Sequence, residues 1–137
     1  MSNEKFESVA ALPDARALEE LWNRCHDSGE HATAIEALGR AIAADDKVAR
    51  LHYMLGCTLQ DAGRWSESAD AYRRALSLEP GLARAQNNLG CLLEAAGDTE
   101  GAMQCYEAAL RAEPGLANAL FNRGNMHKLR GHAARAE

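Results

Sequence analysis

Glycine, alanine, tyrosine and proline recur along this chain at a fixed interval of 34 residues. The residues that keep the interval are Gly29, Gly63, Gly97 and Gly131; Gly56, Gly90 and Gly124; Ala41, Ala75 and Ala109; Tyr72 and Tyr106; and Pro80 and Pro114. So many positions in register do not arise by chance. A period of this length is typical of a helical solenoid, in which each hairpin packs only against its neighbours. The sequence therefore predicts an all-α fold.

The period divides the chain into four repeats after an N-terminal segment. Residues 1–14 are expected to be disordered or to form a short helix that Pro13 stops. The repeats then occupy residues 15–48, 49–82, 83–116 and 117–137, of which the last is truncated. Apolar residues at helical spacing predict helices over about Ala15–Ser28, His31–Ala44, Ala49–Ala62, Trp65–Leu78 and 117–130, with Asp98 or Thr99 as the N-cap of the second helix in the third repeat.

The first and last repeats depart from the pattern. Trp22 occupies the position of Gly56 and Gly90, where the two helices of a hairpin approach most closely, so the first hairpin should be more open. In the last repeat, residues 133–137 are too few for a stable second helix. The chain is therefore interpreted as an N-terminal fragment of a larger protein. The first helix of this repeat, with Leu120, Met126 and Leu129, is expected to expose an apolar surface and to self-associate through residues 117–137.

Composition excludes several classes of protein. No apolar run approaches the roughly 20 residues that span a bilayer, and no secretory signal precedes the repeats, so a membrane partner is not expected. The net charge of −5 argues against nucleic-acid binding. The four cysteines lack a C-x-x-C spacing, and Cys57 and Cys91 would lie on stacked helices beyond disulfide reach. Free thiols favour a reducing, cytoplasmic location.

The recurring L-G, G, A, Y, A and P positions resemble the tetratricopeptide repeat (TPR) family from Ala15 to the C-terminus. The resemblance implies a right-handed α-solenoid of three full repeats and one partial repeat. It also implies a non-enzymatic module that binds a protein or an extended peptide on its concave face. The segment NNLGCLLEAAG is similar to the TPR arm of O-linked N-acetylglucosamine transferases, where an asparagine ladder holds peptide backbone. Two alternatives stay open: the substrate-recruiting arm of a larger enzyme such as a glycosyltransferase, and a structural self-assembly module.

By this resemblance, five positions on the first helix of each repeat are exposed on the concave face. The expected peptide-binding residues are Arg50, Tyr53, Arg84, Asn87, Asn88, Cys91, Asn118, Phe121, Asn122 and Asn125. An asparagine carboxamide offers both donors and an acceptor to a peptide backbone. The asparagine row is absent from the first two repeats, which carry Glu20 and Met54 there. The alternative is that these asparagines only cap turns and solvate the groove.

The first turns of three helices carry an arginine, at Arg16, Arg50 and Arg84. These could form an anion-binding rail, but local pairing with an acid five residues earlier, Asp45 for Arg50 and Glu79 for Arg84, is favoured. The clamp by which some TPR proteins hold chaperone tails is rejected. Although Asn23 and Arg84 match it loosely, its other positions carry Glu19, Met54 and Asn88.

No catalytic site, cofactor site or metal site is predicted. The pairs His26 with His31 and His127 with His132 are five residues apart, which does not match the H-E-x-x-H spacing of zinc proteases. Every glycine is explained by the repeat, so none is assigned to a phosphate loop. Cys25 is expected in the core, and Trp65 is expected to pack at the start of a second helix.

Overall fold

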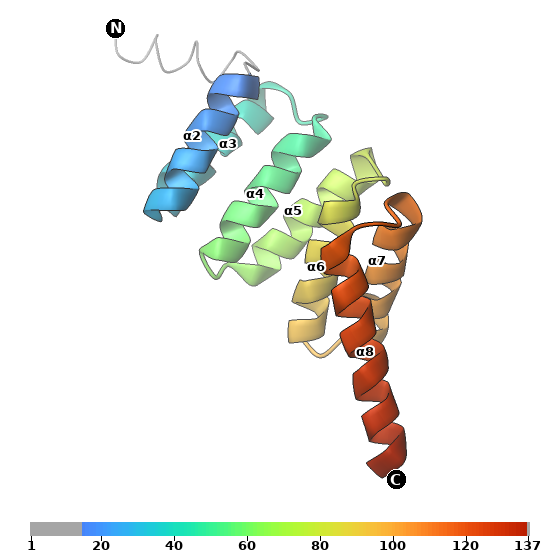
Figure 1. The fold of residues 1–137 in the computed structure, drawn as a ribbon. Helices are drawn as coiled ribbons and strands as arrows, with labels where there is room; N and C mark the ends of the chain where they lie inside the picture. The colour runs from blue at the N-terminus through green and yellow to red at the C-terminus, as the bar shows by residue number, and fades with distance from the viewer. Residues whose placement is uncertain (1–14, 137) are drawn as a thin grey trace, which may run out of the picture. The chain divides into compact units, whose positions relative to one another are not determined.

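A computed structural model describes the backbone of residues 15–136 and the side chains of residues 16–131 (Figure 1). The described part contains helices and turns but no strand, which confirms the all-α class. The N-terminal segment of residues 1–14 lies outside it. The helices are α2 (Ala15–Ser28), α3 (His31–Ala44), α4 (Ala49–Asp61), α5 (Trp65–Leu78), α6 (Ala83–Ala95), α7 (Thr99–Ala112) and α8 (Ala117–Ala136). They fall into two compact units, one that ends at Leu78 and one that begins at Glu79.

The glycine turns end the first helices where the period predicts. Gly29, Gly63 and Gly97 have φ angles of 74°, 78° and 91°, which glycine adopts without the steric cost of a Cβ. The predicted bounds of α2, α3 and α5 are confirmed, and α4 ends one residue earlier than predicted. At the start of α7 the side chain of Asp98 accepts a hydrogen bond from the Gly101 N–H at 2.9 Å, which confirms the predicted N-cap.

A glycine and a tyrosine meet inside the two central hairpins. A Cβ added to Gly56 or Gly90 would lie 2.6 Å from a ring carbon of Tyr72 or Tyr106, respectively. Both rings are completely buried. Their hydroxyls donate at 2.7 Å to Gln60 Oε1 and Glu94 Oε1. The missing Cβ thus lets each second helix place an aromatic ring directly against the backbone of the first.

The first hairpin lacks this contact, because Trp22 replaces the glycine and Leu38 replaces the tyrosine. The backbones of α2 and α3 approach each other at fewer residues than those of α4 and α5 do, in agreement with the expected opening. The Trp22 indole Nε1 instead donates to Thr58 Oγ1 at 2.8 Å, and its ring stacks on His26. The tryptophan therefore ties α2 to α4.

The C-terminal helix differs from the prediction. We expected it to end near Arg130, but α8 continues through Gly131 to Ala136. In the earlier repeats the glycine turn is followed by a helix that buries an apolar face, whereas Ala133–Glu137 supplies only five residues. Met126, expected on the uncovered surface, is buried against Met103 and Tyr106. Leu120 and Leu129 are exposed as expected.

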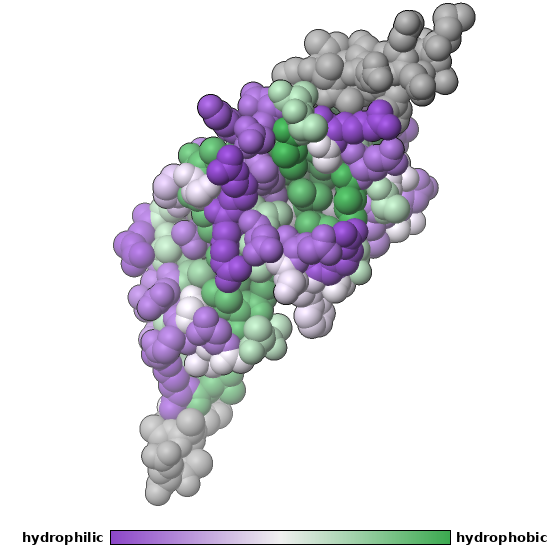
Figure 2. Space-filling model, turned by 180° about the vertical axis from the view of Figure 1, so that it is seen from behind, coloured by the Kyte–Doolittle hydropathy of each residue, from purple (hydrophilic) through white to green (hydrophobic). Residues whose placement is uncertain are grey.

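Cys25 is buried, which confirms its expected place in the core. Ala34, Leu38 and Ala41 of α3 are buried. Trp65, expected to pack at the start of α5, is instead 59% exposed. Figure 2 shows the face opposite to that of Figure 1, where polar side chains predominate and apolar ones are visible between them.

The same substitution at two repeat-equivalent glycines should have opposite effects on stability. Gly90→Ala would place a methyl group against the Tyr106 ring, so we expect it to destabilise the protein by about 1–3 kcal/mol. No atom lies within 4 Å of a Cβ at Gly124. Gly124→Ala should therefore stabilise α8 by about 0.5–1 kcal/mol through helix propensity alone. Urea unfolding of both variants checks this, and equal shifts would contradict the proposed contact.

Candidate functional site

In the second unit, polar side chains of α6 and α8 meet in a hydrogen-bonded network. The Asn122 amide nitrogen donates to Asn87 Oδ1 at 2.9 Å and to Cys91 Sγ at 3.4 Å. Both protons of this amide group are thus used within the protein. The network joins two of the predicted asparagines. It occupies the Asn122 amide nitrogen and Asn87 Oδ1, which are therefore not free to bind a ligand.

The network continues from α6 to the second helix of the same repeat. The Tyr106 hydroxyl lies 3.7 Å from Cys91 Sγ and donates to Glu94 Oε1. Burial raises the pKa of the Cys91 thiol, and burial together with the hydrogen bond to Glu94 raises the pKa of Tyr106. Both groups are therefore protonated at neutral pH. Since the thiolate is the nucleophilic form of cysteine, Cys91 has a structural role in this network.

The predicted asparagines differ in exposure. Asn87, expected on the surface, is only 5% exposed, so this part of the prediction is wrong. Its side chain lies between α6 and α8, where it accepts from Asn122. Asn88 and Asn122 are half-buried, and Asn118 and Asn125 are exposed. The period alone could not distinguish the buried asparagines from the exposed ones, because it does not show which side chains of a helix the next repeat covers.

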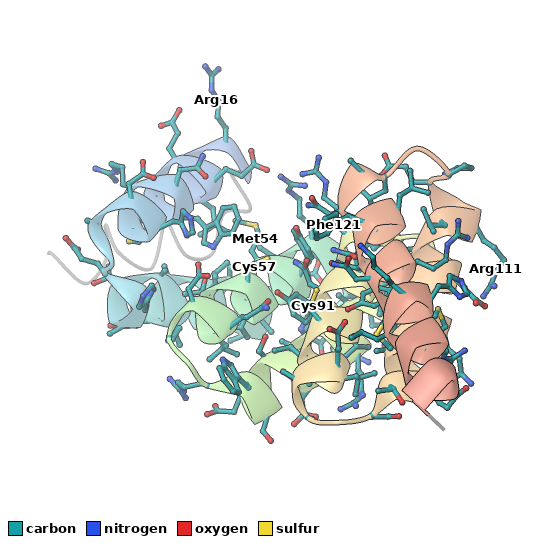
Figure 3. The ribbon with its side chains drawn as sticks, turned by 60° about the horizontal axis from the view of Figure 1, so that its bottom comes forward. Arg16, Met54, Cys57, Cys91, Arg111 and Phe121 are labelled. Atoms are coloured by element: carbon teal, nitrogen blue, oxygen red, sulfur yellow. The ribbon has the colours of Figure 1, made fainter. Side chains whose placement is uncertain are left out.

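An aromatic side chain stands among the exposed amides of α8. Phe121 is 69% exposed and is the most exposed large apolar residue among the described side chains. Figure 3 shows it on α8, with Cys91 on α6. Arg84, in the first turn of α6, is exposed and forms no ion pair with any described side chain. The favoured pairing of Arg84 with Glu79 is therefore wrong. The second unit therefore presents an unpaired cation, two free amides and an aromatic ring.

In the first unit, the predicted site residues Arg50 and Tyr53 lie on α4. The Arg50 Nε donates to Glu19 Oε1 of α2 at 2.7 Å, so the favoured pairing with Asp45 is wrong. Asp45 instead accepts from the Lys47 N–H at 3.0 Å, within its own turn. The ring of Tyr53 is half-buried, with its centroid 6.1 Å from that of Tyr72.

Met54, expected on the concave face, is another correction. It is 1% exposed and packs with Leu38 and Leu51 in the core of the first unit. The remaining arginine of the predicted rail, Arg16, pairs with Glu20 on its own helix at 3.6 Å. The two rail arginines of the first unit, Arg16 and Arg50, are thus already paired with carboxylates, whereas Arg84 of the second unit is not.

Within the described residues, no three histidine, cysteine, aspartate or glutamate side chains converge as a metal ion would require. The nearest approach to such a group is His26, whose Nδ1 lies 2.8 Å from Asp61 Oδ2, with Cys25 buried nearby. None of the four cysteines forms a disulfide. None of the helices described is both long and apolar enough to cross a bilayer.

The structure is similar to solved structures of known proteins. No curated protein matches the sequence significantly. Among solved structures, MamA is 26% identical with a TM-score of 0.76, over 86% of this chain and 69% of that one. The TPR domain of Sgt2 from Aspergillus fumigatus gives a TM-score of 0.81 at 20% identity, over 95% and 88% of the two chains. The first TPR domain of Spaghetti (RPAP3), bound to the HSP90 peptide SRMEEVD, gives 0.78 at 20% identity, over 85% and 93%.

The family assignment follows from the sequence itself. The family model described as tetratricopeptide repeat matches residues 26–83, 53–117 and 87–137, which together cover most of the chain. The 34-residue period, the glycine turns and the glycine–tyrosine hairpins agree with this match. The chain therefore belongs to the tetratricopeptide repeat family.

Proposed function

We propose that this chain is a protein-interaction module that binds an extended peptide, or a flexible segment of a partner protein, on the first-helix face of its second unit. The observation that carries the proposal is the exposed ring of Phe121 between the exposed amides of Asn118 and Asn125. Exposed aromatic residues are frequent anchors of protein interfaces. Free carboxamides can both donate to and accept from a peptide backbone.

The hydrogen-bonded network supports this surface from beneath. Asn122, bonded to Asn87 and Cys91, holds α8 against α6 and fixes the positions of its exposed neighbours. Binding loses less entropy when the groups that contact the ligand are already ordered. In this proposal Asn122 positions the binding residues, while Asn118, Phe121 and Asn125 contact the peptide and Arg84 meets an acidic group.

The nature of the peptide is not transferred from the solved relatives. The Spaghetti domain was solved with the HSP90 peptide SRMEEVD, but at 20% identity the likeness concerns the fold. Glu19, Met54 and Asn88 stand where the chaperone-tail clamp requires other side chains, and Met54 is buried. An aromatic and amide surface therefore defines the proposed specificity. The alternative of a recruiting arm of a larger enzyme would use this same surface.

Removal of the Phe121 ring should weaken peptide binding without affecting folding. Peptides selected from a random library on the wild-type protein should bind Phe121→Ala at least about tenfold more weakly, because an anchor residue contributes about 2 kcal/mol or more. Trp65→Ala, which removes the exposed aromatic of α5, is the matched control and should leave affinity unchanged. Fluorescence anisotropy provides the measurement. Selected peptides that lose affinity for Trp65→Ala instead would refute the proposed site.

Two asparagines on α8 should respond differently to truncation. Asn122→Ala leaves the Oδ1 of the buried Asn87 without its donor, so we expect a loss of about 1–3 kcal/mol in unfolding free energy. Asn125→Ala removes an exposed amide and should be neutral or slightly stabilising, since alanine is the better helix former. Urea unfolding distinguishes the two. The positioning role fails if Asn122→Ala is as stable as Asn125→Ala.

A further inference from the structure

One side of α8 has no neighbour among the described residues. In the preceding repeat, three residues of α6 demonstrably face α7. Gly90 lies against the Tyr106 ring, Leu93 packs against the cluster that contains Tyr106, and Glu94 accepts from the Tyr106 hydroxyl. Their counterparts 34 residues later are Gly124, His127 and Lys128. Nothing lies within 4 Å of a Cβ at Gly124, so the notch that holds a tyrosine ring in two earlier hairpins is open here.

The chemistry of this side is reversed relative to the earlier repeats. His127 replaces the apolar Leu59 and Leu93, and Lys128 replaces Gln60 and Glu94, which accept the tyrosine hydroxyl. A lysine has no acceptor. A helix that packed here as α7 packs on α6 would therefore have to offer carboxylates where α7 offers an apolar side chain and a hydroxyl.

The rest of α8 has the same charge bias. Between Ala117 and Ala136 the helix contains no aspartate or glutamate, whereas it contains Arg123, Lys128, Arg130 and Arg135. Arg130 is paired with Glu100 of α7, and Lys128 is exposed. A second copy of α8 would bring the same charges to the interface and be repelled. Charge complementarity thus favours an acidic helix over a second copy of α8 as the occupant of this side.

The shape of α8 leaves this side accessible. Leu120, Gly124 and His127 are spaced by four and three residues and so lie on one side of the helix, and Leu120 is 43% exposed. Because α8 does not turn at Gly131, its C-terminal half extends past the ends of α6 and α7 (Figure 1). An apolar residue and an open notch bordered by an imidazole and a lysine suit an amphipathic helix.

We propose that this side of α8, formed by Leu120, Gly124, His127 and Lys128, binds an acidic amphipathic helix of a partner protein. An aromatic side chain of that helix occupies the notch at Gly124, and its carboxylates meet His127 and Lys128. Leu120, Gly124 and His127 lie on a different side of α8 from Asn118 and Asn125, and Lys128 lies between the two sides. Gly124→Leu therefore changes the helix-docking side and leaves the amides of the proposed peptide site in place.

The probe for this site can be copied from the chain. Thr99–Ala112 fills the equivalent notch at Gly90, so the probe is a lactam-bridged peptide of that sequence with Cys105→Ser. Met103 belongs to the cluster against which Leu93, the counterpart of His127, packs, so a Met103→Glu change is designed to bring a carboxylate near His127. We expect the Met103→Glu probe to bind at least about tenfold more tightly than two control probes. The first control keeps Met103, and the second carries both Met103→Glu and Tyr106→Ala. The affinity of the Met103→Glu probe should fall as salt rises.

Variants of the full chain identify where the probe binds. Gly124→Leu fills the notch and should reduce affinity at least about tenfold, with unchanged helix content because the position is open. Lys128→Glu should reduce it similarly, and a probe with Met103→Lys should bind this variant more tightly than it binds the wild type. Gly39→Leu, at another open helical glycine in α3, is the matched control and should bind normally.

Three outcomes would overturn the proposal. The first is equal affinity for the wild type and Gly124→Leu. The second is equal binding of the probes with and without the Tyr106 ring. The third is a concentration-dependent dimer in sedimentation velocity that Gly124→Leu abolishes, because it would identify a second copy of the chain as the occupant of this face.

Discussion

The contact between a glycine of the first helix and a tyrosine of the second closes the two central hairpins. Without a Cβ at Gly56 or Gly90, the ring of Tyr72 or Tyr106 can lie flat against helical backbone. The buried ring then needs a partner for its hydroxyl, and Gln60 or Glu94 one turn further along the first helix supplies it. The tyrosine thus provides both the packing against the glycine and the buried hydrogen bond, and this arrangement recurs in the next repeat.

The first repeat lacks both members of this pair, because Trp22 and Leu38 occupy their positions, whereas α8 keeps the glycine without a ring against it. Trp22 occupies the glycine position of the first repeat, and its indole bonds to Thr58 of α4 rather than closing its own hairpin. Gly124 keeps the glycine, but no ring fills its notch, and the helix that carries it continues through Gly131 without a turn. The proposed helix-docking side of α8 is a direct consequence of that open notch.

The sequence predicted the fold well because periodicity records which positions of a repeat must be small, apolar or turning. The bounds of α2, α3 and α5, the burial of Leu38 and the cap at Asp98 all follow from it. It did not predict that Met54 and Asn87 are buried or that Arg50 pairs with Glu19. These properties depend on side chains from other helices, whose directions a repeat position does not encode. The candidate site could therefore be located on the first helices, but its exposed and internally bonded members could be separated only in three dimensions.

The central claim, that a glycine–tyrosine contact closes the two central hairpins and is absent from α8, can be measured directly by nuclear magnetic resonance. The account predicts nuclear Overhauser effects from the Hα protons of Gly56 and Gly90 to the ring protons of Tyr72 and Tyr106, with upfield ring-current shifts of those glycine protons. The Hα protons of Gly124 should show neither effect. A ring contact at Gly124, or its absence at Gly90, would contradict the account.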